Sequence, residues 1–151
     1  MIHDFTFYQC SQLTTVILGE GLEEIGKGAF RECTSLREMG IPPAVKVIKI
    51  AAFHRCLQLT TAVLGEGLEE VGMGAFQECT SLHEIAIPHA VKSIQDGAFG
   101  LCIQLTTVFL GEGLEEIDDK AFCECTSLQR IVIDPTDAPI HESDFVLRRK
   151  Q

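Results

Sequence analysis

The sequence has no long hydrophobic segment and no excess of basic residues, and each absence narrows its possible roles. No stretch reaches the roughly 18 unbroken apolar residues that a membrane-spanning helix requires, so no membrane partner is expected. The 22 acidic residues outnumber the 12 basic ones and give a formal charge of -10. Because such a surface repels phosphate backbones, nucleic acid is not an expected partner either.

The beginning of the chain lacks the features of an export signal. Residues 1–5 contain neither a basic segment nor the long apolar stretch of a signal peptide. A cytoplasmic location is therefore the expectation. The cell surface is the alternative if the chain is a fragment of a longer protein.

What the sequence does contain is one motif written six times. Phenylalanine, cysteine and leucine each recur at intervals of 23 residues, without exception. A fixed period of this length predicts a solenoid, in which every repeat packs only against its neighbours. The three columns are Phe7, Phe30, Phe53, Phe76, Phe99 and Phe122; Cys10, Cys33, Cys56, Cys79, Cys102 and Cys125; and Leu13, Leu36, Leu59, Leu82, Leu105 and Leu128.

Each repeat is expected to form one coil. Residues 13–18 alternate in polarity and are rich in β-branched side chains, which is typical of a short strand. Gly19 and Gly21 then permit a tight turn, and a second extended piece follows. The Ala-Phe-x-x-Cys motif at 29–33 has helical spacing and predicts one turn of α- or 3₁₀-helix on the opposite side.

Aliphatic positions repeat with the same period and predict a continuous hydrophobic core. Burying each aliphatic side chain contributes about 1.5–3 kcal/mol, so a column of them offsets ordering entropy that a single coil could not. The four columns are Val16, Met39, Ala62, Ile85, Val108 and Ile131; Leu18, Ile41, Leu64, Ile87, Leu110 and Ile133; Leu22, Val45, Leu68, Val91 and Leu114; and Ile25, Ile48, Val71, Ile94 and Ile117.

A second period, twice as long, lies on top of the first. Odd coils carry Gly-Glu-Gly-Leu-Glu-Glu, whereas even coils carry Ile-Pro-x-Ala-Val-Lys. One column therefore alternates in charge, and slipping by one coil would stack like charges, so the alternation favours one register. The odd motifs lie at 19–24, 65–70 and 111–116, the even ones at 41–46 and 87–92, and the alternating column is Glu23, Lys46, Glu69, Lys92 and Glu115.

The two ends of the predicted array differ. Residues 1–133 are assigned to the solenoid, whose first half-coil offers Phe5, Phe7 and Tyr8 rather than a polar cap. Solenoids need capped ends to avoid stacking on other chains, so either the array is longer or a partner covers this end, and self-association there is one possibility. After Ile133 the pattern decays, and residues 134–151 are expected to form a degenerate C-terminal cap.

The column cysteines raise the question of disulfide bonds. Stacked strands lie about 4.8 Å apart, but parallel side chains do not face one another as a disulfide requires. The favoured interpretation is a column of small buried thiols, which also fits a reducing compartment. Cys123 lies off the column and is expected to be more exposed.

The repeated run Leu-x-x-Val-x-Leu-Gly-Glu-Gly-Leu-Glu-Glu-Ile-Gly-x-Gly-Ala-Phe-x-x-Cys resembles the BspA-like class of leucine-rich repeats, over about residues 5–133. The resemblance implies an α/β repeat protein of about six 23-residue coils. Its right-handed solenoid would carry a parallel β-sheet on one face and short α or 3₁₀ turns on the other. It also implies a protein-binding or adhesive role without catalysis.

No catalytic or metal-binding constellation stands out from the sequence. Paired acids such as Glu23 and Glu24 belong to a turn expected to be solvated, where nothing raises a pKa. Cys123 and Cys125 form the one close thiol pair, but metal sites more often use Cys-x-x-Cys with a second pair. The five histidines are scattered. No enzyme activity, cofactor or metal is therefore expected.

The outward face of the predicted sheet is the remaining candidate for a functional site. If Val16 and Leu18 face the core, Thr15 and Ile17 face outward. An outward apolar stripe flanked by threonine and acidic residues is typical of a protein interface, with Phe109 as its expected anchor. The alternative is that β-branched residues simply suit stacked strands. The expected partner-binding residues are Thr15, Ile17, Glu38, Thr61, Val63, Glu84, Thr107, Phe109, Arg130 and Val132.

The sequence thus predicts a non-catalytic scaffold that binds a protein partner through its open sheet face. The alternative is a structural, assembly or cell-surface adhesion element that stacks through its uncapped N-terminal end.

Overall fold

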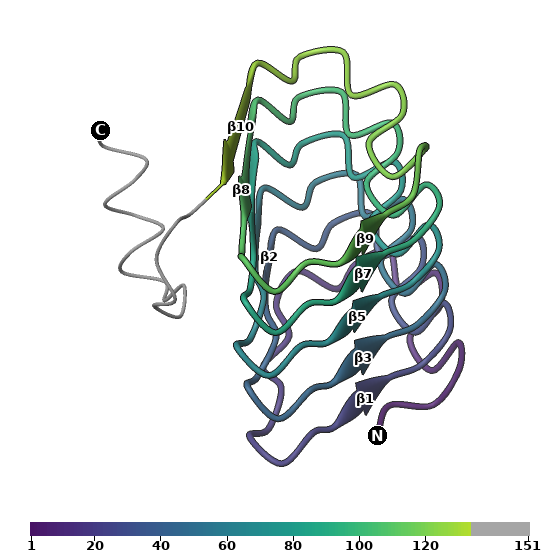
Figure 1. Ribbon diagram of the computed structural model, residues 1–151. Helices are drawn as coiled ribbons and strands as arrows, with labels where there is room; N and C mark the ends of the chain where they lie inside the picture. Colours follow the sequence, from purple (N-terminus) through teal and green to yellow (C-terminus); the bar gives the residue numbers. More distant parts are fainter. Residues whose placement is uncertain (134–151) are drawn as a thin grey trace.

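The computed structural model describes residues 1–133, and they form a solenoid whose coils stack in chain order (Figure 1). All strand pairs are parallel, and each coil passes through the same sequence of strand, turn, strand and turn. The predicted repeat architecture is confirmed. The C-terminal cap expected at 134–151 lies outside the described residues.

Two sides of the solenoid are built from strands. The short-strand wall is a five-stranded sheet in the order β1-β3-β5-β7-β9. The long-strand wall consists of two sheets, β2-β4 and β10-β8-β6. The short-strand wall contains β1 (Glu24–Ile25), β3 (Val47–Ile48), β5 (Glu70–Val71), β7 (Ser93–Ile94) and β9 (Glu116–Ile117). The long-strand wall contains β2 (Glu38–Gly40), β4 (Thr61–Val63), β6 (Glu84–Ile87), β8 (Thr107–Leu110) and β10 (Arg130–Ile133).

The strand register follows the sequence repeat. In the short-strand wall, Ile25 pairs with Ile48, Ile48 with Val71, Val71 with Ile94, and Ile94 with Ile117. Because parallel pairing in register sets equivalent positions side by side, each aliphatic column becomes a continuous strip of core. The first three of these side chains are fully buried.

The third side of the solenoid, called the turn side below, consists of single hydrogen-bonded turns. At the first Ala-Phe-x-x-Cys motif, Cys33 N–H donates to Phe30 O at 3.2 Å. The turn does not extend into a helix because Phe30 N–H and Glu32 N–H donate instead to Ala52 O and His54 O in the next coil, at 2.7 and 2.8 Å. Glu32 also has φ of 60°, a left-handed conformation that ends the turn. The predicted helical turns are therefore isolated turns, and residues 1–133 contain no helix.

The column phenylalanines stack ring on ring beneath the turn side. Successive ring centroids from Phe7 to Phe122 lie 5.0–5.3 Å apart, in nearly parallel planes. The four inner rings are fully buried. Aromatic pairs of this kind contribute about 0.5–1.5 kcal/mol beyond their buried area, so the column ties neighbouring coils together.

The column cysteines are free thiols, as predicted. The thiol of Cys33 donates to Phe7 O at 3.1 Å, and Cys56, one coil later, donates to Phe30 O at 3.2 Å. Burial raises the pKa of Cys33 to about 11 and that of Cys56 still further. These thiols therefore serve as protonated hydrogen-bond donors between coils. The same bond joins Cys79 to Phe53, Cys102 to Phe76 and Cys125 to Phe99.

Two sequence-based expectations fail at the ends of the array. The strand predicted at 13–18 is not formed, because the backbone contact of this segment with the next coil is a long hydrogen bond of 3.4 Å from Arg37 N–H to Thr14 O. The predicted core residues Ile131 and Ile133 are 57% and 70% exposed. They lie in the last described coil, so no described coil covers their outer side.

Candidate functional site

The long-strand wall brings the predicted polar binding residues into one row. Glu38 of β2 is paired with Thr61 of β4, and Glu84 of β6 with Thr107 of β8. Arg130 of β10 follows beside Thr107. Acidic and threonine side chains therefore alternate along the wall, and the last described position is basic.

The apolar outward positions form a second row next to the first. Val63 is paired with Gly40, and Phe109 stands between Ala86 and Val132. A Cβ added to Gly40 would meet no atom within 4 Å, so the wall is open beside Val63. The apolar row is thus interrupted by a small residue in each even coil.

Accessibility divides the predicted residues into two groups. Phe109 is only 5% exposed and Thr107 only 7%, so neither side chain is an accessible contact. The expectation of an exposed Phe109 anchor is wrong for this structure, because alternation along a strand predicts the direction of a side chain but not what packs around it. Thr15, Ile17, Glu38 and Arg130 are exposed, and Thr61, Val63, Glu84 and Val132 are half-buried.

A shallow hollow lies on the long-strand wall between the first two coils. It has a volume of about 380 Å³ and is lined by Thr14, Thr15, Arg37 and Glu38. Its lining offers hydroxyls and one charge of each sign, so it suits polar groups of a partner rather than an apolar side chain. Only Thr15 and Glu38 of these four were among the predicted contacts. Arg37 was missed, although its column alternates threonine with a longer polar side chain, as Thr14, Arg37, Thr60, His83, Thr106 and Gln129.

A larger hollow opens at the N-terminal end of the solenoid. It has a volume of about 530 Å³ and a mainly apolar lining. Ile17, at its edge, is 92% exposed. We call this feature the N-terminal hollow; it is lined by Met1, Ile2, Phe7, Val16, Ile17, Leu18, Gly19, Gly21 and Leu22.

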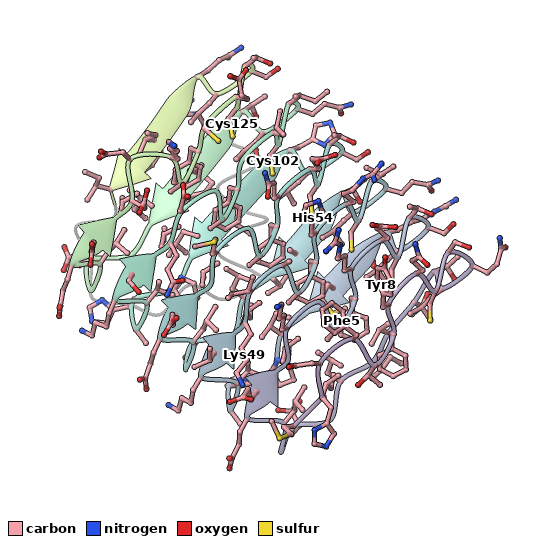
Figure 2. The ribbon with its side chains drawn as sticks, turned by 90° about the vertical axis from the view of Figure 1, so that its right-hand side faces the viewer. Phe5, Tyr8, Lys49, His54, Cys102 and Cys125 are labelled. Carbon is pink, nitrogen blue, oxygen red and sulfur yellow. The ribbon has the colours of Figure 1, made fainter. Side chains whose placement is uncertain are left out.

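Aromatic side chains lie on the turn side of the same end. Phe5 and Tyr8 meet edge to face, with ring centroids 5.9 Å apart. Lys27 Nζ lies 5.8 Å from the Phe5 centroid and Arg31 Cζ lies 5.8 Å from that of Tyr8, distances at which cation–π attraction operates. Figure 2 shows both rings at this end of the turn side. Phe5 and Tyr8 remain 44% and 41% exposed, so the N-terminal end has open apolar surface on its turn side as well as at the N-terminal hollow.

The alternating charge column forms ion pairs in one direction only. Lys46 Nζ lies 3.3 Å from Glu69 Oε1, and Lys92 Nζ lies 3.8 Å from Glu115 Oε1. Each lysine of an even coil thus reaches forward to the next odd coil. All four side chains are at least half exposed, so each pair contributes only about 0.2–1 kcal/mol.

A small titratable cluster occupies the turn side around His54 (Figure 2). Its Nε2 lies 3.5 Å from Glu78 Oε1, while Arg55 Nε lies 3.4 Å from Glu78 Oε2. Burial, assisted by the charge of Arg31, lowers the pKa of His54. The imidazole is therefore neutral near pH 7. No hydroxyl or thiol nucleophile is hydrogen-bonded to it in the part of the chain that the structure describes.

Two further features concern metals and membranes. Across residues 1–133, no three histidine, cysteine, aspartate or glutamate side chains gather closely enough to hold a metal ion. The same residues include no helix with the length and hydrophobicity needed to cross a bilayer.

Comparison with solved structures finds relatives of the same shape. A leucine-rich repeat protein from T. pallidum is 29% identical with a TM-score of 0.84, and the match covers 99% of this chain and 75% of that one. A leucine-rich cell surface protein from Faecalibacterium prausnitzii A2-165 is 28% identical with a TM-score of 0.75 and is matched over 85% of this chain. The pneumococcal vaccine antigen PcpA, at 18% identity and a TM-score of 0.62, shares the fold over 79% of this chain and 30% of its own.

The chain spans about a third, 33%, of the F. prausnitzii protein. No curated protein sequence matches it. None of these findings supports a cytoplasmic location, since the F. prausnitzii relative is described as a cell surface protein. At the family level the match is direct: a model of the BspA type leucine-rich repeat region fits residues 1–145 in 6 copies. The chain belongs to the BspA-type leucine-rich repeat family.

Proposed function

We propose that this chain is a non-catalytic scaffold that binds a protein through its long-strand wall. The observation that carries the proposal is the arrangement around Val63, a half-buried apolar side chain beside the open surface at Gly40. Glu38 and Thr61 border it in register. An apolar centre with a polar rim is the common anatomy of a protein interface.

The charge of the wall indicates what kind of partner fits. Glu38 and Glu84 lie on alternate coils of this wall, and the formal charge of the whole chain is -10. A partner with basic residues around an apolar patch would be steered toward this wall and would bind faster at low salt. The proposed contacts are Thr15, Ile17, Glu38, Thr61, Val63, Glu84, Arg130 and Val132, and Thr107 and Phe109 are buried members of the same two rows.

The test uses a matched pair of valines on the two walls. Val63 lies in β4 of the long-strand wall and Val47 in β3 of the short-strand wall, and both are half-buried. Partners captured with the wild-type chain would be purified and titrated against Val63→Glu and Val47→Glu. Loss of binding with Val63→Glu alone supports the wall as the site, whereas equal binding by both variants would refute it.

A second candidate function is association through the N-terminal end, as part of an adhesive or structural assembly. It is favoured by the N-terminal hollow and by the 92% exposure of Ile17, since exposed apolar ends of repeat arrays attract other chains. A cell-surface setting is consistent with the relative described as a cell surface protein. Accessibility of the full-length protein to protease on intact cells would test that setting.

A further inference from the structure

The glycines of the odd coils lie directly against the backbone of the preceding even coil. A Cβ added to Gly67 would lie 2.0 Å from Pro43 O, and one added to Gly113 would lie 1.8 Å from His89 O. Real side chains do not fit at such distances, so only glycine lets the two turns approach. The Gly-Glu-Gly turn of each of these odd coils thus packs against the backbone of the Ile-Pro-x-Ala-Val-Lys turn in the preceding even coil.

The first odd coil carries the same glycines without the contact. A Cβ added to Gly19 or Gly21 would meet nothing within 4 Å. Neither residue has the positive φ that would itself require glycine. Their backbone conformation therefore permits a side chain. The position that an even-coil turn occupies at Gly67 and Gly113 is open at Gly19 and Gly21.

The charge at this end is also left without its counterpart. Glu69 and Glu115 each meet a lysine from the preceding even coil, at 3.3 and 3.8 Å. Glu23 occupies the equivalent position, is exposed, and forms no ion pair with any described residue. The end of the solenoid therefore presents a carboxylate where the repeat places a lysine partner.

The column cysteines provide a third, independent observation that the first coil lacks a contact made by the later coils. From Cys33 to Cys125, each column thiol donates to the carbonyl oxygen of a phenylalanine 26 residues earlier. Cys10 is half-buried, and none of the described residues accepts a hydrogen bond from its thiol. The acceptor that the repeat calls for would belong to a coil in front of Met1.

We propose that the N-terminal end is a docking site for an even-type coil, presented by another leucine-rich repeat chain through an Ile-Pro-x-Ala-Val-Lys turn. The backbone of the proline and of the residue after it would lie over Gly19 and Gly21, the lysine would pair with Glu23, and the apolar side chains would fill the N-terminal hollow. This proposal rests on the second candidate function above and names its partner.

The even-coil motif is not repeated in this sequence at the next position expected after residues 87–92. Counting 46 positions on from Val91 and Lys92 leads to Asp137 and Ala138. The sequence there has an acidic residue where the even coils have valine, and no lysine to match Glu23. Charge complementarity therefore favours a different leucine-rich repeat chain over head-to-tail stacking of identical copies.

The probe is a synthetic 23-residue peptide with the sequence of residues 24–46, which ends in the even-coil turn. It would be titrated into the full chain by calorimetry, while labelling of Cys10 with a thiol reagent is followed by mass spectrometry. We expect saturable binding and a fall in Cys10 labelling of about tenfold or more, because burial and a hydrogen bond protect a thiol. The labelling of Cys123 should not change.

Two glycine variants provide a matched pair, since Gly21 and Gly40 both have nothing within 4 Å of an added Cβ. Gly21→Val should weaken the peptide by about tenfold or more, because its side chain fills space that the peptide backbone needs. Gly40→Val, on the long-strand wall, should leave the affinity unchanged. Replacing the peptide's final lysine by glutamate should weaken binding by about two- to fivefold, the range of an exposed ion pair.

A covalent fusion of the peptide to the chain tests whether an even coil fits this end, independently of how tightly the free peptide binds. Placing the same 23 residues directly before Met1 would set their final lysine 23 positions ahead of Glu23, in register. The fusion should raise Tm and protect Cys10, and Gly21→Val should cancel both effects.

Each contrary result has a distinct meaning. Absence of peptide binding, or equal binding by Gly21→Val, overturns docking of an even coil in trans, whatever the fusion does. Concentration-dependent self-association that Gly21→Val abolishes would overturn the heterologous partner but keep association through this end. A concentration-independent monomer that also ignores the peptide would remove both the docking site and the second candidate function.

Discussion

The thiol of Cys79 donates a hydrogen bond to the carbonyl oxygen of Phe53, 3.2 Å away in the preceding coil. Both residues are fully buried. The bond recurs at every described coil boundary where a preceding phenylalanine is present, so sulfur links the coils in the same way that amide groups link the strands.

Cys79→Ala should therefore destabilise the solenoid. The change removes the thiol hydrogen bond and leaves a small cavity, which together cost about 1–3 kcal/mol. The measurement is the chemical-denaturation midpoint compared with that of Cys123→Ala, since Cys123 is half-buried and off the column. Equal midpoints for the two variants would contradict a structural role for the thiol column.

Native-state labelling should separate the cysteines by position. Burial raises the pKa of Cys79 well above its ordinary value, and that of Cys125 to about 11. Because the thiolate is the reactive form, iodoacetamide at pH 8 should label Cys123 and spare Cys79 until the protein is denatured. Mass spectrometry of the labelled peptides gives the order in which the cysteines react. Rapid labelling of Cys79 in the folded protein would show that the core opens far more readily than its packing implies.

Glycines of the same motif should differ in their tolerance of side chains. Gly67→Val would drive its Cβ into Pro43 O, which lies 2.0 Å from that position, and should cost about 3 kcal/mol or more. Gly21→Val, in the equivalent place at the free end, should change the free energy of unfolding by about 0.5 kcal/mol or less. Thermal and denaturant unfolding measure both. Similar losses would mean that the turn itself, and not the neighbouring coil, requires glycine.

Stability should fall on acidification through the region where His54 titrates. Burial lowers the folded-state pKa of His54 below its unfolded value, which is near 6.5. The unfolded chain therefore takes up a proton first, so stability contributed above pH 6.5 is lost as the pH falls through the folded-state pKa.

The control for this dependence is His54→Gln, which cannot titrate. Denaturation midpoints measured from pH 7.5 to pH 5 should decline less steeply for this variant than for the wild type. Parallel curves would show that other groups account for the acid sensitivity. Glu78, which lies 3.5 Å from His54, is retained in both proteins.

Much of the fold follows from the period of the sequence. Identical spacing of phenylalanine, cysteine and leucine is sufficient to place Phe53 over Phe30 and Cys56 over Cys33, because a repeat that packs only on its neighbours has a single register in which equal residues meet. The free, buried state of the thiols follows from the same alignment. The pairing of Lys46 with Glu69 and not with Glu23 does not, because the alternating column places Lys46 between the two.

The candidate sites were less predictable, and the reason lies in what surrounds each coil. Alternation along β8 predicted that Phe109 points outward, but its exposure of 5% depends on packing beyond its own strand. The segment 13–18 has strong strand propensity, yet it forms no strand at the end of the array. Propensity is a local property, whereas a strand also needs regular backbone hydrogen bonds to a neighbour, and this segment makes one of 3.4 Å to Arg37.

The sequence by itself determined the coil, its period and the order of the side chains in the core, because these depend only on which residues recur. Tertiary structure alone decided that the third side is made of turns and not helices, since the amide groups of Phe30 and Glu32 donate across to the next coil. The tertiary structure also decided which member of each column has open space beside it. Gly21 and Gly67 share one motif, and the difference between them is whether a neighbouring coil is present.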